Sequence, residues 1–81
     1  MNYILFAKKE CPFCIKAEDL LKTHDLNYSM VNFQEDQSDI LQEIKNAYDW
    51  GTVPMIFARD ADSIKFVGGF TDLVRFLENE R

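Results

Sequence analysis

The chain has little of several features that mark other classes of protein. It carries 9 lysine and arginine residues against 14 aspartate and glutamate residues, so its formal net charge is −5 at pH 7. Such a surface lacks the attraction of a basic one for phosphate backbones and anionic lipids, which argues against nucleic acid or a membrane as partner. No apolar run approaches the ~20 residues of a membrane span, and the N-terminal segment has neither a basic opening nor a small-residue cleavage site. We therefore expect a cytoplasmic protein.

Cysteine and histidine are scarce as well, with two cysteines and one histidine in 81 residues. Secreted domains of this size usually carry several disulfides, and a bridge between Cys11 and Cys14 closes too small a loop to constrain the unfolded chain much. A closed zinc site needs four ligands, and only His24 could join the two cysteines as a nitrogen or sulfur ligand. A structural disulfide and half of a zinc site remain alternatives, and redox chemistry is the favoured interpretation.

The cysteines lie between a short apolar run that ends at Ala7 and a stretch of helical periodicity that begins at Pro12. A cysteine at the start of a helix meets unpaired backbone N–H groups and the positive end of the helix dipole, both of which favour thiolate over thiol. Cys11 is therefore the candidate nucleophile. Cys14, three residues on, is placed to attack a mixed disulfide on Cys11 and release the product as a thiol.

The apolar pattern predicts one α/β domain over residues 1–81, because a chain of this length holds one core. Residues 35–39 are interpreted as a solvated acidic loop. Met55 and Phe57 are assigned to the core, and the Phe13 ring, between the cysteines, is expected to be exposed. The predicted elements are a strand over 2–7, a helix over 12–24, a strand over 28–33, a helix from 37 or 38 to 48, a hairpin over 55–58 and 64–67, and a helix from 71.

Four segments in this order give the chain its resemblance to a known family. They are Lys8-Lys9-Glu10-Cys11-Pro12-Phe13-Cys14, Thr52-Val53-Pro54, Gly68-Gly69 and Thr71-Asp72-Leu73. Through them the chain resembles the glutaredoxins, small proteins of the thioredoxin fold. The resemblance implies a four-stranded mixed sheet with three flanking helices in the order βαβαββα.

The resemblance also implies roles for individual residues. Cys11 and Cys14 match the catalytic nucleophile and the resolving cysteine, and Pro54 matches a cis proline. Trp50 is a departure, because the family often has Arg, Lys or Gln there. The residues that match a glutathione site are Lys8 at the glycyl carboxylate, Phe13, Thr52, Val53 with its backbone on the glutathione backbone, Pro54, Gly69, and Thr71 and Asp72 at the γ-glutamyl end.

The function implied by this resemblance is that of an enzyme, a glutathione-dependent thiol-disulfide oxidoreductase that reduces protein disulfides and glutathione-mixed disulfides. Glutathione would act as co-substrate and disulfide-containing proteins as clients. We expect no metal, because the chain has too few ligands, and a monomer, because no exposed apolar face is left over once the three helices and the sheet have packed. One alternative is a redoxin that takes electrons from a thioredoxin reductase and gives them to ribonucleotide reductase. A second alternative, disfavoured by Pro12, is a module in which Cys11 and glutathione hold a [2Fe-2S] cluster.

Overall fold

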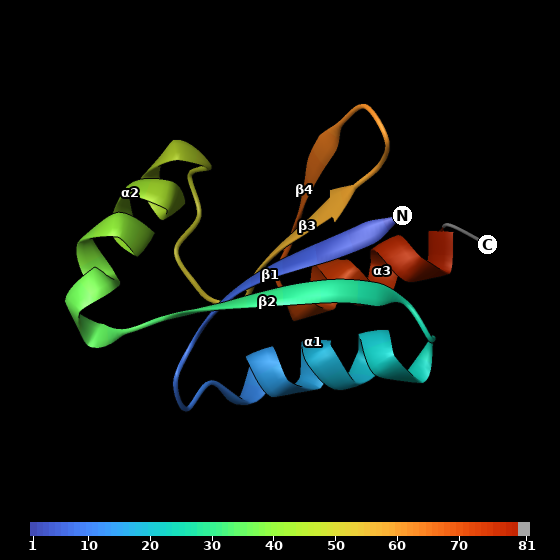
Figure 1. Cartoon of the computed structure of the whole chain (residues 1–81), viewed down its shortest axis with the longest axis horizontal. Coiled ribbons are helices and arrows are strands. Elements are labelled where there is room, and N and C mark those ends of the chain that lie inside the picture. The colour runs from blue at the N-terminus through green and yellow to red at the C-terminus, as the bar shows by residue number, and fades with distance from the viewer. Residues whose placement is uncertain (80–81) are drawn as a thin grey trace.

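A computed structural model of the chain describes residues 1–79. Figure 1 shows two strands joined through a helix, then a second helix, a hairpin and a last helix. None of the described helices has the length and apolar character needed to cross a membrane. The elements are β1 (Asn2–Lys8), α1 (Pro12–Thr23), β2 (Asn27–Phe33), the 3-10 helix η1 (Glu35–Gln37), α2 (Ser38–Ala47), β3 (Met55–Arg59), β4 (Ile64–Gly68) and α3 (Phe70–Asn79).

The four strands form one mixed sheet in the order β2-β1-β3-β4. β1 runs parallel to β2, and the crossover between them is made by α1, as a parallel pair requires. β3 pairs antiparallel with both β1 and β4. The register sets Lys8, the last residue of β1, beside Phe33, the last residue of β2. The connections after these two strands therefore leave the sheet at the same end.

Each face of the sheet is covered by its own apolar cluster. Helices α1 and α3 share one face, and α2 lies away from them in Figure 1, with its buried Leu41 packed on the other face. The two faces follow from the alternation of side chains along a strand. The first cluster consists of Tyr3, Leu5, Ala17, Leu21, Ile56, Ala58 and Leu73, and the second is built on Leu41, Met55 and Phe57.

The many aromatic rings strengthen the second, smaller cluster. Tyr48, Phe57 and Phe66 lie with their ring centroids 5.1 to 5.2 Å apart, and Phe6 adds a further contact to Phe57 at 5.2 Å. Phe57 is buried in this group, Tyr48 stays partly exposed, and tilted or edge-on pairs at this separation are favourable. A chain of 81 residues can bury only a small core, and aromatic packing enlarges the apolar contact area within it.

The predicted order of elements is confirmed, and the differences lie at the ends of the elements. Residues 35–39 are not a loop, because η1 covers Glu35–Gln37 and α2 follows at once from Ser38. The Gln37 side chain accepts a hydrogen bond from the backbone N–H of Gln34 at 2.9 Å, which closes this turn. The last helix begins at Phe70, one residue before the predicted start. These differences rest on local hydrogen bonds that apolar periodicity does not register.

A hydrogen bond between α1 and β2 gives the fold a pH-dependent contact. The Tyr28 hydroxyl donates to Glu18 Oε2 at 2.7 Å. This bond is the largest cause that raises the pKa of Tyr28 above its ordinary value of 10.0, because it is lost when the phenol ionises. The folded phenol thus keeps its proton at a pH where the unfolded phenol has lost it, so this contribution to stability is present below pH 10 and falls above it.

We expect Tyr28→Phe to lower the stability at neutral pH and to weaken its decline above pH 10, because the variant has no phenol to ionise. Urea unfolding at pH 7 to 11 measures both effects. Glu18→Ala, which removes the acceptor and keeps the phenol, should bring the Tyr28 titration back toward its ordinary value. An unchanged Tyr28 titration in Glu18→Ala would contradict this account.

Candidate active site

Cys11 stands at the N-cap of α1, where the chain turns from β1 into the helix. Its backbone is extended, Pro12 takes the first helical position, and no acidic side chain lies in the first turn. The backbone N–H of Cys14 donates to Cys11 Sγ at 3.2 Å. An N–H donor and the positive end of the helix dipole both stabilise negative charge on this sulfur when it is reduced. The structure therefore gives Cys11 the environment of a reactive thiolate.

The two cysteines are joined by a disulfide, with their Cα atoms 5.2 Å apart, and they differ in exposure. Cys11 is half-buried, whereas Cys14 is 2% exposed. An incoming disulfide can therefore reach the sulfur of Cys11, whereas the surrounding residues shield the sulfur of Cys14. This asymmetry favours Cys11 as the attacking sulfur and Cys14 as the resolving sulfur.

We expect iodoacetamide to alkylate Cys11 of the reduced protein at least about tenfold faster than Cys14, because Cys11 is accessible and favours the thiolate. Peptide mass spectrometry after short exposures at pH 7 measures the two rates. Alkylation in denaturant, where burial is lost, serves as the control. Equal rates in the folded protein would contradict the assignment.

The loop before β3 faces Cys11. The Val53–Pro54 peptide bond is cis, as the resemblance implied, and the Val53 carbonyl oxygen lies 3.9 Å from Cys11 Sγ. Pro54 is buried, whereas Thr52 is exposed. The backbone of this loop lies next to the sulfur, where it can pair with the backbone of an extended ligand.

The N-terminus of α3 forms another side of the site. Asp72, at the third helical position, accepts a hydrogen bond on Oδ2 from the Gly69 N–H at 2.9 Å, as in one half of a capping box. A Cβ on Gly69 would lie 3.8 Å from the Pro54 carbonyl oxygen, which shows how close the two backbones approach. Thr71 is exposed beside them. The predicted residues of both segments are therefore brought together.

Two aromatic rings border the cysteines. Phe13 is 53% exposed, as predicted, and its ring centroid lies 6.1 Å from that of Phe70. The Lys16 ammonium lies 5.0 Å from the Phe13 centroid, at a cation–π distance. Phe70 was not among the predicted site residues, although it stands between Gly69 and Thr71, which were. Its contact with Phe13 depends on the packing of α1 against α3.

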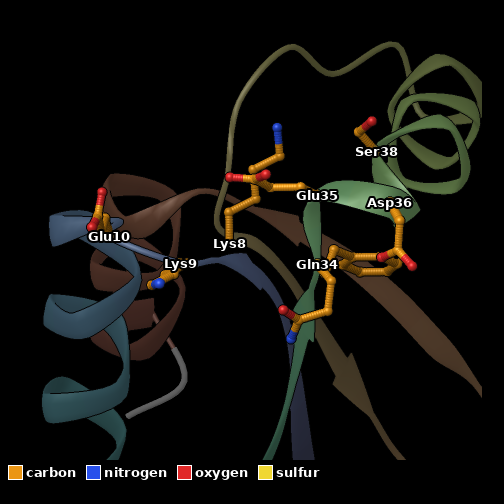
Figure 2. Close-up of a pocket in the computed structure, with 8 residues that line it drawn as sticks. Lys8, Lys9, Glu10, Gln34, Glu35, Asp36 and Ser38 are labelled. Atoms are coloured by element: carbon orange, nitrogen blue, oxygen red, sulfur yellow. The ribbon is translucent and has the colours of Figure 1, made fainter.

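Lys8 lines a hollow of about 860 Å³ at the end of the sheet where β1 and β2 end. In Figure 2 the Glu35 side chain extends toward Lys8, while Lys9 points in another direction. The hollow is lined by Lys8, Lys9, Glu10, Phe33, Gln34, Glu35, Asp36 and Ser38. Lys8 therefore shares the hollow with the carboxylates of Glu10, Glu35 and Asp36, which were not among the predicted site residues.

Trp50, the departure from the family pattern, serves the packing of the site. Its ring packs edge-on against Phe66 at 5.2 Å, and its Cζ2 atom lies 3.6 Å from where a Cβ on Gly69 would stand. The buried Nε1 atom has no hydrogen-bond partner among the described residues. An indole in this position supports the glycine and carries no charge.

His24 stands exposed at the C-cap of α1, at the opposite end of that helix from Cys11. This agrees with its interpretation as a solvated helix-end residue. Among residues 1–79, no group of three His, Cys, Asp or Glu side chains is placed to hold a metal ion.

A cysteine pair at a helix start, facing a cis-proline loop on a mixed sheet, defines a thiol-disulfide oxidoreductase of the thioredoxin fold. The sequence model of the glutaredoxin family matches residues 4–62 of this chain, which is more than half of it. The chain belongs to the glutaredoxin family.

Several known proteins are similar to this chain over nearly its whole length. Glutaredoxin 1 of Escherichia coli (strain K12) is 26% identical to it, over 96% of this chain and 94% of that protein. The crystal structure of a wheat glutaredoxin covers 98% of this chain and 74% of its own, with a TM-score of 0.82 at 21% identity. A buckwheat glutaredoxin, crystallised as a glutathione complex, covers 96% of this chain and 69% of its own, with a TM-score of 0.81 at 19% identity.

Proposed function

We propose that this protein is a glutathione-dependent oxidoreductase that reduces glutathione-mixed disulfides and protein disulfides. The observation that carries the proposal is the placement of Cys11, with its Sγ 3.9 Å from the Val53 carbonyl oxygen beside the loop of exposed Thr52. A ligand whose sulfur reacts at Cys11 would have that backbone within reach. The glutathione complex of the buckwheat relative supports the same class of ligand.

The predicted contacts to glutathione lie at its two carboxylate-bearing ends and along its central backbone. Lys8 would attract the glycyl carboxylate, while Thr52, Val53 and Pro54 would face the central backbone. At the other end, Asp72 Oδ1 would accept from the γ-glutamyl ammonium group, because Oδ2 already accepts from Gly69 N–H. Thr71 and Phe13 would complete the surface.

The chemistry for a glutathione-mixed disulfide takes two exchanges. The Cys11 thiolate attacks the glutathione sulfur, forms a Cys11–glutathione disulfide and releases the other thiolate, which takes a proton from water. A second glutathione thiolate then attacks the glutathione sulfur of that disulfide. This step yields oxidised glutathione and restores the Cys11 thiolate.

A protein disulfide requires Cys14 as well. Cys11 forms a mixed disulfide with one client sulfur and releases the other. The Cys14 thiolate attacks Cys11 Sγ, frees the client as a dithiol and leaves the Cys11–Cys14 disulfide. Two glutathione molecules reduce that disulfide and leave as oxidised glutathione.

The test is reduction of the mixed disulfide of glutathione and 2-mercaptoethanol, coupled to glutathione reductase. We expect turnover in the native protein and a higher KM in Lys8→Met, because the variant loses the charge that would meet a carboxylate. Lys22→Met, on the last turn of α1, removes a charge far along that helix and is the matched control. Absence of turnover in the native protein would overturn the proposal.

One observation favours a second electron source. Trp50, where relatives often carry a cation, packs on Phe66 and Gly69 instead of offering charge to a carboxylate. A weaker glutathione site would suit a redoxin that is reduced by a thioredoxin reductase and passes electrons to ribonucleotide reductase. Turnover with thioredoxin reductase and none with glutathione would select this function.

A further inference from the structure

We propose that Glu35 is a specificity-determining residue that weakens the attraction of Lys8 for anionic thiol substrates. The inference rests on the proposed function, because it concerns the cation expected to meet the glycyl carboxylate of glutathione. Glu35 and Lys8 line the same hollow at the end of the sheet. A carboxylate there lowers the positive potential that a substrate carboxylate would meet.

The fold fixes this placement of Glu35. β1 and β2 are parallel and in register, so Lys8 stands level with Phe33, and Glu35 follows two residues later. The η1 turn begins at Glu35 and keeps it at the end of β2. In Figure 2 the Glu35 side chain extends toward the side of the hollow where Lys8 stands, while the Asp36 carboxylate points away from Lys8. Glu35 is therefore expected to have a larger effect than Asp36.

The opposing charges are exposed to solvent, which sets the size of the effect. Lys8 and Glu35 are both exposed, so water screens their interaction. Charges within one Debye length, about 8 Å at physiological salt, still influence one another. We therefore expect Glu35→Gln to raise kcat/KM for a glutathione-mixed disulfide about two- to fivefold at low salt.

The effect should appear in KM and not in kcat, because Glu35 acts on a remote carboxylate and not on the reacting sulfurs. It should diminish at 0.5 M salt, where screening is stronger. It should also shrink for a neutral disulfide such as oxidised 2-mercaptoethanol. If Glu35 had a merely structural role, its substitution would change the KM for both substrates alike.

The experiment is a double-mutant cycle measured with the mixed disulfide of glutathione and 2-mercaptoethanol at low salt. The variants are Glu35→Gln, Lys8→Met and the pair together, with Glu43→Gln as a control that removes one exposed carboxylate of α2 outside the hollow. We expect Glu35→Gln to lower KM only while Lys8 is present, Glu43→Gln to leave KM nearly unchanged, and Glu35→Lys to exceed Glu35→Gln.

Three results would overturn the inference while the proposed function stands. They are an unchanged KM in Glu35→Gln, an equal gain in Glu43→Gln, and a gain that persists in the Lys8→Met background. The third would show that net charge matters and that the Lys8–Glu35 pair does not. A native protein without glutathione turnover would instead overturn the proposed function and this inference with it.

Discussion

Cys11→Ser is expected to reduce disulfide exchange by about three orders of magnitude or more, for both small and protein disulfides. A serine hydroxyl stays protonated at neutral pH and forms no disulfide, so neither exchange can begin. The half-buried position of Cys11 at the start of α1, with the N–H of Cys14 3.2 Å from its sulfur, is the reason to assign the first attack to this residue. Initial rates at pH 7 with both substrate classes measure the loss.

Cys14→Ser is the matched variant, because it changes the same atom in the partner cysteine. We expect it to keep turnover of a glutathione-mixed disulfide, since a second glutathione can complete that reaction. Reduction of a protein disulfide should stall at the mixed disulfide with Cys11. Equal losses in the two variants for the small substrate would contradict the separate roles, and full activity of Cys11→Ser would overturn the assignment.

Gly68→Ala is expected to have the largest effect on stability among substitutions that add a single methyl group. Gly68 has a φ of +123°, where a side chain strains the backbone. An added Cβ would lie 2.5 Å from Asp72 Oδ2 and 2.8 Å from Asp72 Cβ. The second atom belongs to the frame of α3 and cannot rotate away. We therefore expect a loss of about 2–3 kcal/mol in the free energy of unfolding.

The same substitution should disturb the site, because Asp72 both caps α3 through the Gly69 N–H and stands at the expected γ-glutamyl end. Thermal melting and the KM for a glutathione-mixed disulfide measure the two effects. Gly51→Ala is the control, since a Cβ at Gly51 would have no heavy atom within 4 Å and its φ is not positive. Melting of Gly68→Ala at the temperature of Gly51→Ala would contradict the argument.

The core of the site could be predicted from the sequence because its signals are local. A cysteine before Pro12, between an apolar run and a helical pattern, already indicates a sulfur at a helix start, and the structure places Cys11 at the N-cap. The cis Val53–Pro54 bond was implied by resemblance alone and is present. The sequence could not say that Cys14 is the shielded sulfur, since burial depends on how α1 packs.

The contacts between distant segments lay beyond prediction from the sequence. The Phe13–Phe70 ring contact requires α1 and α3 to lie on one face of the sheet. The shared hollow of Lys8 and Glu35 requires the parallel register of β1 and β2, which fixes where the chain beyond Phe33 turns. The sequence indicated Phe13 and Lys8 as site residues but not their partners Phe70 and Glu35, because these approaches are created by tertiary packing.

The fold itself could be predicted in order, with less precision at the ends of elements. Alternation and helical periodicity identify β1, α1 and the hairpin, because those patterns reflect which side chains face the two apolar clusters. Residues 35–37 were misassigned to a loop because charged residues are common in exposed turns of every kind, and the bond between Gln34 N–H and the Gln37 side chain closes a 3-10 turn here. The start of α2 at Ser38 agrees with its predicted start.

The most direct test is to react the Cys14→Ser protein, which keeps Cys11 as its only thiol, with a glutathione-mixed disulfide and to measure its mass. The account predicts one glutathione per chain, held on the peptide that contains Cys11 and removed when free glutathione is added. Cys11→Ser treated in the same way should take up far less, because Cys14 is shielded. A Cys14→Ser protein that gains no glutathione, although its thiol is reduced and its fold is intact, would contradict the account.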